Sequence, residues 1–139
     1  MIMKIAGAQL RSLWENPVRS LKKAEPYIRK AADQGASLIC FPEQYPTGWD
    51  PGSVLHVQDR EGLIVSRFRD LAREYGIAIL GSFRERYLPK PRNTCIVINR
   101  DGEEVASYSK CHLFTPADED GWYSPGDKLG IFRLEGVPF

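Results

Sequence analysis

The sequence predicts an α/β fold, because strand-like and helix-like segments alternate along its first half. An apolar run at residues 38–41 lies between Gly35 and Pro42 and has the length of a strand. A continuous apolar run of this kind is typical of a strand buried on both faces of a sheet. Two longer segments, residues 17–34 and 61–75, carry apolar residues at helical spacing along one face. Such helices cover a sheet, so we expect at least one β-α-β crossover.

The first elements follow from local signals. Residues 4–10 predict a strand, and Asn16-Pro17 predicts the start of a helix, with asparagine at the N-cap and proline in the first helical position. Pro26 lies inside the helical pattern and is expected to kink or divide the helix. Gly35 is expected to cap its end. Prolines and glycines predict a loop over residues 45–57.

The second half continues with a helix and several strands. The helix over residues 61–75 is expected to end at Gly76, and residues 77–83 predict another buried strand. Residues 94–98 and 104–110 predict two strands joined by a turn at 99–102. Residues 115–128 read as a loop, and residues 131–134 as a short strand. We expect all 139 residues to form one domain.

Composition excludes several classes of function. The chain is 42% hydrophobic and 27% charged, which is an ordinary balance for a soluble protein. The net charge of +1 gives no electrostatic basis for binding nucleic acid or an acidic membrane surface. No apolar run is long enough to span a membrane. Three cysteines, an odd number, favour reduced thiols and a cytoplasmic location. His56 and His112 lack metal-ligand spacing, so we expect neither a metal nor another cofactor.

Glu43 and Lys110 are the first candidates for a functional site. Glu43 directly follows the buried strand at residues 38–41, and the carboxyl ends of strands are where open α/β proteins bind ligands. Lys110 likewise ends a predicted strand and begins a loop. Either residue alone is typical of a charge that faces water. The two surrounding segments, taken together, indicate a site.

Those segments carry a family resemblance. Gly-Ala-Ser-Leu-Ile-Cys-Phe-Pro-Glu at residues 35–43 and Tyr-Ser-Lys-Cys-His-Leu-Phe at 108–114 resemble the first two signature segments of the nitrilase, or carbon–nitrogen hydrolase, superfamily. Residues 75–83, 92–102 and 122–127, the last with Pro-Gly-Asp, resemble the family as well. The resemblance runs from about residue 4 to residue 139. It implies a single, truncated domain, residues 1–139, that forms the amino-terminal half of an α-β-β-α sandwich.

The resemblance also implies a chemistry. Members of the family hydrolyse non-peptide carbon–nitrogen bonds of amides, nitriles or N-carbamoyl compounds through a glutamate, a lysine and a cysteine. Glu43 is the implied general base, Lys110 the implied oxyanion group and Glu119 an implied second glutamate, although Asp118 and Asp120 permit other alignments of the last. The physical logic is that a thiol needs a base to become a nucleophile, and an oxyanion needs a positive donor.

The cysteines depart from the family pattern. The nucleophilic cysteine of the family follows a Gly-Val-Pro-Phe segment, and this sequence ends at that segment. Cys40 and Cys95 read as small core residues, and Cys111 stands where the family does not require cysteine. We therefore expect the chain alone to be inactive. It would need a missing carboxyl-terminal half, or self-association as a homo-oligomer, to cover exposed sheet edges and an apolar sheet face.

Further residues are candidates for substrate binding, and other functions stay open. Trp49, His112, Trp122 and Tyr123 are expected near the site, where they would line a pocket for a small amide, nitrile or carbamoyl substrate. The alternative is that the aromatic residues pack their loops and His112 orients the Lys110 loop. A non-catalytic interaction module, and a hydrolase that uses Glu43 and Glu119 as a carboxylate pair, are the competing functions.

Overall fold

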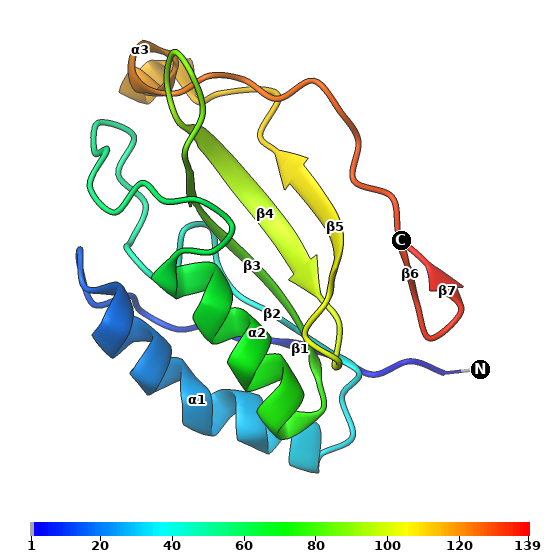
Figure 1. The fold of residues 1–139 in the computed structure, drawn as a ribbon. Coiled ribbons are helices and arrows are strands. Elements are labelled where there is room, and N and C mark those ends of the chain that lie inside the picture. The colour runs from blue at the N-terminus through cyan, green and yellow to red at the C-terminus, as the bar shows by residue number, and fades with distance from the viewer. Residues whose placement is uncertain (1) are drawn as a thin grey trace.

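The computed structural model describes residues 2–139, and its centre is a mixed sheet of five strands in the order β1-β2-β3-β4-β5 (Figure 1). The first three strands are parallel, and the last two join in antiparallel fashion. Helices α1 (Pro17–Asp33) and α2 (Leu63–Tyr75) form the two crossovers between the parallel strands, which confirms the predicted α/β alternation. The strands are β1 (Ile5–Gly7), β2 (Leu38–Cys40), β3 (Ala78–Glu85), β4 (Arg92–Ile98) and β5 (Glu104–Ser109).

Helix α1 begins as predicted but is not divided. The side chain of Asn16 accepts the backbone N–H of Arg19 at 3.2 Å, and Pro17 is the first helical residue. The helix continues through Pro26 as one element, so the expected division there is wrong. Proline removes one hydrogen bond from the helix, and the apolar face still holds the helix on the sheet. That face consists of Leu21, Ala24, Ile28 and Ala31, all buried.

Helix α2 ends at Gly76, whose φ of 63° is the left-handed conformation that glycine adopts most easily. The two helices lie side by side on one face of the sheet (Figure 1), where they share one apolar core with the strands. Phe68 of α2 packs directly on β3, because a Cβ atom added at Gly81 would lie 2.5 Å from its ring. The helices therefore leave the other sheet face to other segments.

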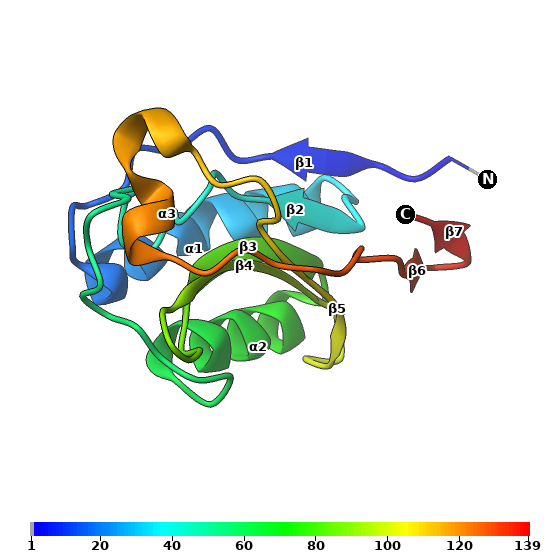
Figure 2. The same ribbon diagram turned by 90° about the horizontal axis from the view of Figure 1, so that it is seen from above.

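That other face carries a smaller apolar cluster. Leu134 packs there with residues of β2, β3 and β4, and it belongs to a hairpin formed by β6 (Arg133–Leu134) and β7 (Val137–Pro138). Figure 2 shows this hairpin beyond the end of the sheet, beside the carboxyl end of the chain. The cover is partial, since Ile5 and Tyr108 remain 49% and 37% exposed. Of the short strand predicted at residues 131–134, the structure forms the last two residues as β6, and β7 was missed.

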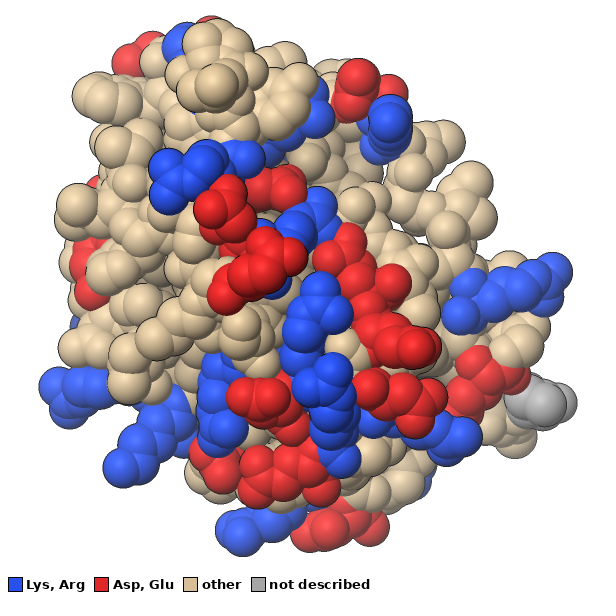
Figure 3. All heavy atoms as spheres, viewed as in Figure 1, with Lys and Arg blue, Asp and Glu red and all other residues tan. Residues whose placement is uncertain are grey.

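Two long segments without strands, residues 41–57 and 110–132, begin at the same end of the sheet, and the second then runs back beside β5 toward β6 (Figure 1). The second contains a 3₁₀ turn, η1 (Thr115–Ala117), and a one-turn helix, α3 (Glu119–Trp122), where the sequence predicted only loop. Elements this short are too brief to show a periodic pattern. On the face seen in Figure 3, basic and acidic side chains are interspersed, and neither sign forms a large area.

Among residues 2–139, no helix combines the length and the apolar composition that crossing a bilayer requires.

Candidate active site

The sheet brings Glu43 and Lys110 together. Strands β3 and β5 both lie antiparallel to β4, so β5 runs in the same direction as β2 and β3. Glu43 follows β2 and Lys110 follows β5, and both therefore leave the sheet at the same edge. The Nζ atom of Lys110 lies 3.0 Å from Oε1 of Glu43. About half of the Glu43 side chain, 46%, is exposed.

Glu119, the first residue of α3, completes an ion-pair cluster with these two residues. Its carboxylate is fully buried, and Oε2 lies 2.9 Å from Nζ of Lys110. The same oxygen accepts the backbone N–H of Phe114 at 2.7 Å. The structure thus places Glu119 on Lys110, whereas the neighbouring Asp118 and Asp120 are exposed.

Asn93 of β4 joins the two carboxylates, and the sequence analysis did not single it out. Its Nδ2 donates to Oε1 of Glu43 at 2.6 Å and to Oε1 of Glu119 at 3.2 Å. Its backbone carbonyl accepts the N–H of Lys110 at 2.9 Å. The sequence offered one indication of its role, namely that Asn93 is a polar residue near the start of the mostly apolar β4. Because the amide of Asn93 is neutral and carries two N–H donors, it links the two carboxylates without adding a charge.

Hydrogen bonds outweigh burial in this cluster and keep Lys110 and Glu119 charged. Burial by itself would raise the pKa of Glu119, but hydrogen bonds from Lys110, the Phe114 amide and Asn93 outweigh it and lower that pKa below its ordinary value. Burial likewise opposes the charge on Lys110, and the contacts with Glu119 and Glu43 outweigh it and raise the pKa of Lys110. The Lys110–Glu119 pair is therefore ionised at neutral pH.

A hollow of about 350 Å³ borders Glu43 and Lys110 on the loop side. The indole of Trp49 forms one wall, with its ring centre 5.7 Å from Nζ of Lys110, and it meets the ring of Phe114 edge-on at 6.0 Å. The structure therefore brings two predicted substrate residues, Trp49 and His112, next to the Glu43–Lys110 pair. The lining residues are Glu43, Trp49, Lys110, His112, Leu113 and Phe114.

A second hollow of about 340 Å³ lies on the sheet face opposite the helices and is lined in part by Glu43, Lys110 and Cys95. Burial, together with the nearby thiol of Cys40, raises the pKa of Cys95 to about 11, so this thiol is protonated at neutral pH. Burial also raises the pKa of Cys40. The third thiol, on Cys111, faces the carbonyl of Ser109 at 3.5 Å and lines neither hollow.

The other two predicted substrate residues lie elsewhere. Tyr123 is 1% exposed, and its hydroxyl donates to the backbone carbonyl of Ser53 at 2.6 Å. Burial raises the pKa of Tyr123 to about 12, so the hydroxyl keeps its proton. Trp122 is 46% exposed and, like Tyr123, lines neither hollow. Within residues 2–139, no three histidine, cysteine, aspartate or glutamate side chains are placed to hold a metal ion.

Comparison with known proteins confirms the family resemblance. Residues 4–137 match the family model for carbon-nitrogen hydrolases, and the chain belongs to that family. It is 32% identical to the 2-oxoglutaramate amidase of Bacillus subtilis (strain 168), over 96% of this chain and 52% of that protein. It is 30% identical to a nitrilase of Pyrococcus abyssi, over 99% of this chain and 53% of that protein. The chain therefore spans about half the length of the curated relatives that it matches.

Solved structures of amidases share the fold of this chain. An amidase from Nesterenkonia sp. superposes with a TM-score of 0.87 at 27% identity, covering 98% of this chain and 53% of the amidase. One mutant of the Nesterenkonia sp. AN1 amidase was solved in complex with butyramide. Another shows Michael addition of acrylamide at the active-site cysteine of that enzyme. The α/β fold predicted from the sequence is thus the fold of nitrilase-superfamily amidases.

Proposed function

We propose that this chain supplies the glutamate and lysine of a carbon–nitrogen hydrolase that cleaves amides by a Glu-Lys-Cys mechanism. The observation that carries the proposal is the position of the Lys110 ammonium, 3.0 Å from Glu43 and 2.9 Å from Glu119, at the border of two hollows. Membership of the carbon–nitrogen hydrolase family supports the reaction class. Relatives named 2-oxoglutaramate amidase and omega-amidase favour an amide substrate, and the relative named nitrilase is the reason to test a nitrile beside it.

In the proposed reaction Glu43 is the general base. It takes the proton from the nucleophilic thiol as the sulfur attacks the amide carbon. The Lys110 ammonium donates a hydrogen bond to the oxyanion that forms. Glu43 then returns the proton to the departing nitrogen. Ammonia is released, and the acyl group remains on the cysteine as a thioester. Water, activated by Glu43, hydrolyses the thioester and releases the carboxylic acid and the thiol.

We further propose that the nucleophile is a cysteine from outside these 139 residues. The raised pKa of Cys95 and of Cys40 makes both thiols poor nucleophiles. Cys111 has its sulfur directed to backbone carbonyls rather than into either hollow beside Glu43. Glu119, fully buried, is proposed to hold Lys110 in place and not to touch substrate.

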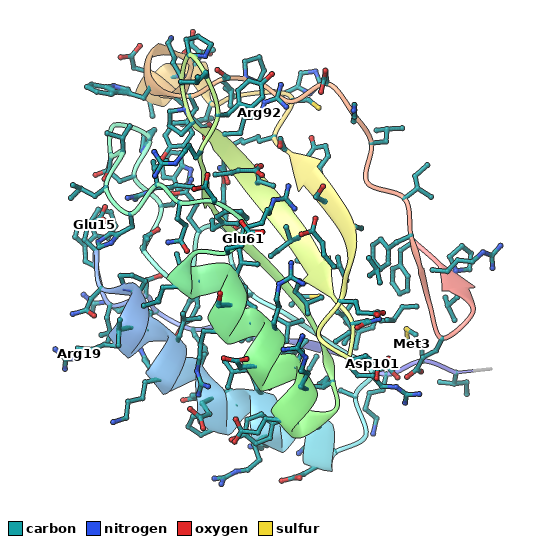
Figure 4. The ribbon with its side chains drawn as sticks, viewed as in Figure 1. Met3, Glu15, Arg19, Glu61, Arg92 and Asp101 are labelled. Atoms are coloured by element: carbon teal, nitrogen blue, oxygen red, sulfur yellow. The ribbon has the colours of Figure 1, made fainter. Side chains whose placement is uncertain are left out.

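The test uses this polypeptide alone and joined to the portion of the B. subtilis amidase that the match does not cover. Ammonia release is measured with butyramide, 2-oxoglutaramate, a nitrile and an N-carbamoyl amine. We expect activity only in the joined protein, and a loss of about a hundredfold or more in kcat/KM for Glu43→Gln and Lys110→Met. Glu61→Gln, at an exposed glutamate before α2 (Figure 4), is the matched control.

Two outcomes would contradict the proposal. A joined protein that folds but hydrolyses none of the compounds would refute the reaction class. Activity of the 139-residue chain that disappears in Cys111→Ala would make Cys111 the nucleophile. The carboxylate-pair hydrolase is less favoured, because the buried Glu119 carboxylate has no exposed surface to offer a substrate.

The second candidate function is a self-associating, non-catalytic module. It is favoured by the partial cover of the sheet face opposite the helices, where Ile5 and Tyr108 are exposed. Light scattering coupled to size-exclusion chromatography tests the self-association: a dimer or larger assembly supports it, and a stable monomer counts against it. Ammonia release by the joined protein tests the catalytic function separately.

A further inference from the structure

The segment that carries Glu43 and Trp49 has no helix or strand of its own. Residues 41–57 are irregular throughout, and this is long for a connection inside a compact domain. Three of its residues are in the left-handed conformation: Gln44 with a φ of 49°, Gly48 with a φ of 85° and His56 with a φ of 59°. A loop of this length keeps one conformation only if its backbone groups find partners elsewhere.

Arg84 supplies several of those partners. It lies in β3, and its side chain is fully buried. Its Nε donates to the side-chain oxygen of Gln44 at 3.1 Å, and Nη2 donates to the carbonyl of Gly48 at 3.1 Å. Its Nη1 donates to the carbonyl of Leu55 at 2.8 Å and to Oγ of Ser53 at 2.9 Å. One guanidinium therefore touches the loop at its beginning, middle and end.

The charge of Arg84 is balanced from another segment. Glu15, in the connection from β1 to α1, places a carboxylate oxygen 2.9 Å from Nη1. Figure 4 shows Glu15 beside the irregular segment that leads from β2 to α2. A planar guanidinium spreads five N–H donors over three nitrogens, so with one shared bond at Nη1 it reaches all of these acceptors, whereas the single ammonium of lysine cannot.

Further hydrogen bonds fix the chain close to both glutamates of the site. Ser82, two residues before Arg84 in β3, accepts the backbone N–H of Gln44 at 2.7 Å, and Gln44 directly follows Glu43. At the far end of the loop, the carbonyl of Ser53 accepts the hydroxyl of Tyr123 at 2.6 Å. Tyr123 directly follows α3, the helix that begins with Glu119.

We propose that Arg84 is a positioning residue of this site, which holds residues 41–57 so that Glu43 and Trp49 meet Lys110. Arg84 touches none of these three residues and acts through the backbone between them. The catalytic consequence rests on the proposed function above, but the placement of the loop does not.

The test compares Arg84→Met and Arg84→Lys with a matched control, Arg60→Met. Arg60 is less buried than Arg84, with 27% of its side chain exposed, and it pairs with Glu85 and Glu104, which lie outside residues 41–57. Hydrogen exchange followed by mass spectrometry measures how well the backbone amides of residues 41–57 are protected. The rate at which an amine-reactive reagent acylates Lys110, relative to the exposed Lys22, reports how accessible the site is. Neither readout requires activity.

For Arg84→Met we expect exchange in residues 41–57 to rise about tenfold or more, and Lys110 to be acylated several times faster than in the wild type. Arg84→Lys should not rescue either change. Arg60→Met should leave both readouts at the wild-type level. If Arg84→Met does not fold, Ser53→Ala replaces it, since it removes one acceptor and keeps the Arg84–Glu15 pair; we expect a smaller rise in the same peptide.

Loop exchange and Lys110 acylation that stay within twofold of the wild type in a folded Arg84 variant, or in Ser53→Ala, would overturn the proposal. So would equal changes in Arg60→Met. In the joined enzyme, Arg84→Met should lower kcat more than it changes KM. If the wild-type joined enzyme is inactive, the proposed function fails, and the exchange and acylation results still decide the role of Arg84.

Discussion

Replacing Glu119 with glutamine should destabilise the protein although the side chain keeps its shape. The carboxylate accepts Lys110 and the Phe114 amide on Oε2 and Asn93 on Oε1. Glutamine has one acceptor oxygen, so at least one of these donors would face an NH₂ group instead. A lost hydrogen bond to a charged group costs about 1.5–3 kcal/mol when buried. Lys110 is 25% exposed and keeps Glu43, so we expect a loss of about 2 kcal/mol.

Thermal unfolding followed by circular dichroism measures this loss. For a domain of 139 residues, about 2 kcal/mol corresponds to a fall in Tm of roughly 7 °C at pH 7. Glu61→Gln, at an exposed position, should leave Tm within about 1 °C of the wild type. A Tm for Glu119→Gln that matches this control would refute the view that the buried carboxylate is held by its three donors.

The difference between wild type and Glu119→Gln should also depend on pH. Because the folded protein lowers the pKa of Glu119, the stabilisation is present above the ordinary glutamate pKa of about 4.3. It is lost as the pH falls from that value through the lower pKa of the folded state. The two proteins should therefore approach equal stability in acid, and a difference that grows as the pH falls would have the wrong sign.

Three further predictions concern other parts of the chain. Asn16→Ala removes the side-chain cap of α1 and should lower the free energy of unfolding by about 1 kcal/mol in urea titrations. Gly76→Ala places a Cβ at a φ of 63° and should cost about 1 kcal/mol by the same measurement; an unchanged midpoint in either variant would contradict the assigned cap. The thiol of Cys95, with a pKa of about 11 against the ordinary 9.0, should be alkylated at pH 8 about a hundredfold more slowly in the folded chain than in urea; equal rates would show that it is not buried.

The parts of the fold that were predicted well are those with a local cause. The expected helix at residues 61–75 differs from α2 (Leu63–Tyr75) by two residues at its start, and Gly76 ends it as expected. A periodic apolar face and a left-handed cap are properties of neighbouring residues, so a single sequence reveals them. Helix α3 has four residues and too short a pattern to be seen; contacts of Glu119 with Lys110 and Asn93 hold it in place.

The site was predicted in part for the same reason. Glu43 and Lys110 lie in segments that carry recognisable sequence motifs, and the structure brings them into contact. Arg84 and Asn93 make their decisive contacts with residues about 40 and 50 positions away, at Gln44 and Glu43. Nothing in their immediate neighbours indicates those contacts, and only the register of the sheet determines them.

The separation of Glu43 and Lys110 has a consequence for how the chain folds. The two residues are 67 positions apart, and their contact exists only when β2, β3, β4 and β5 have all paired in register. Closing so long a segment costs chain entropy before any contact compensates for it, so distant pairings form slowly. Strands β3, β4 and β5 are joined by short connections and can pair early, whereas β2 reaches β3 only across helix α2. The ion pair at the sheet edge is then one of the last native contacts to form, and its appearance in a refolding experiment marks the completion of the sheet.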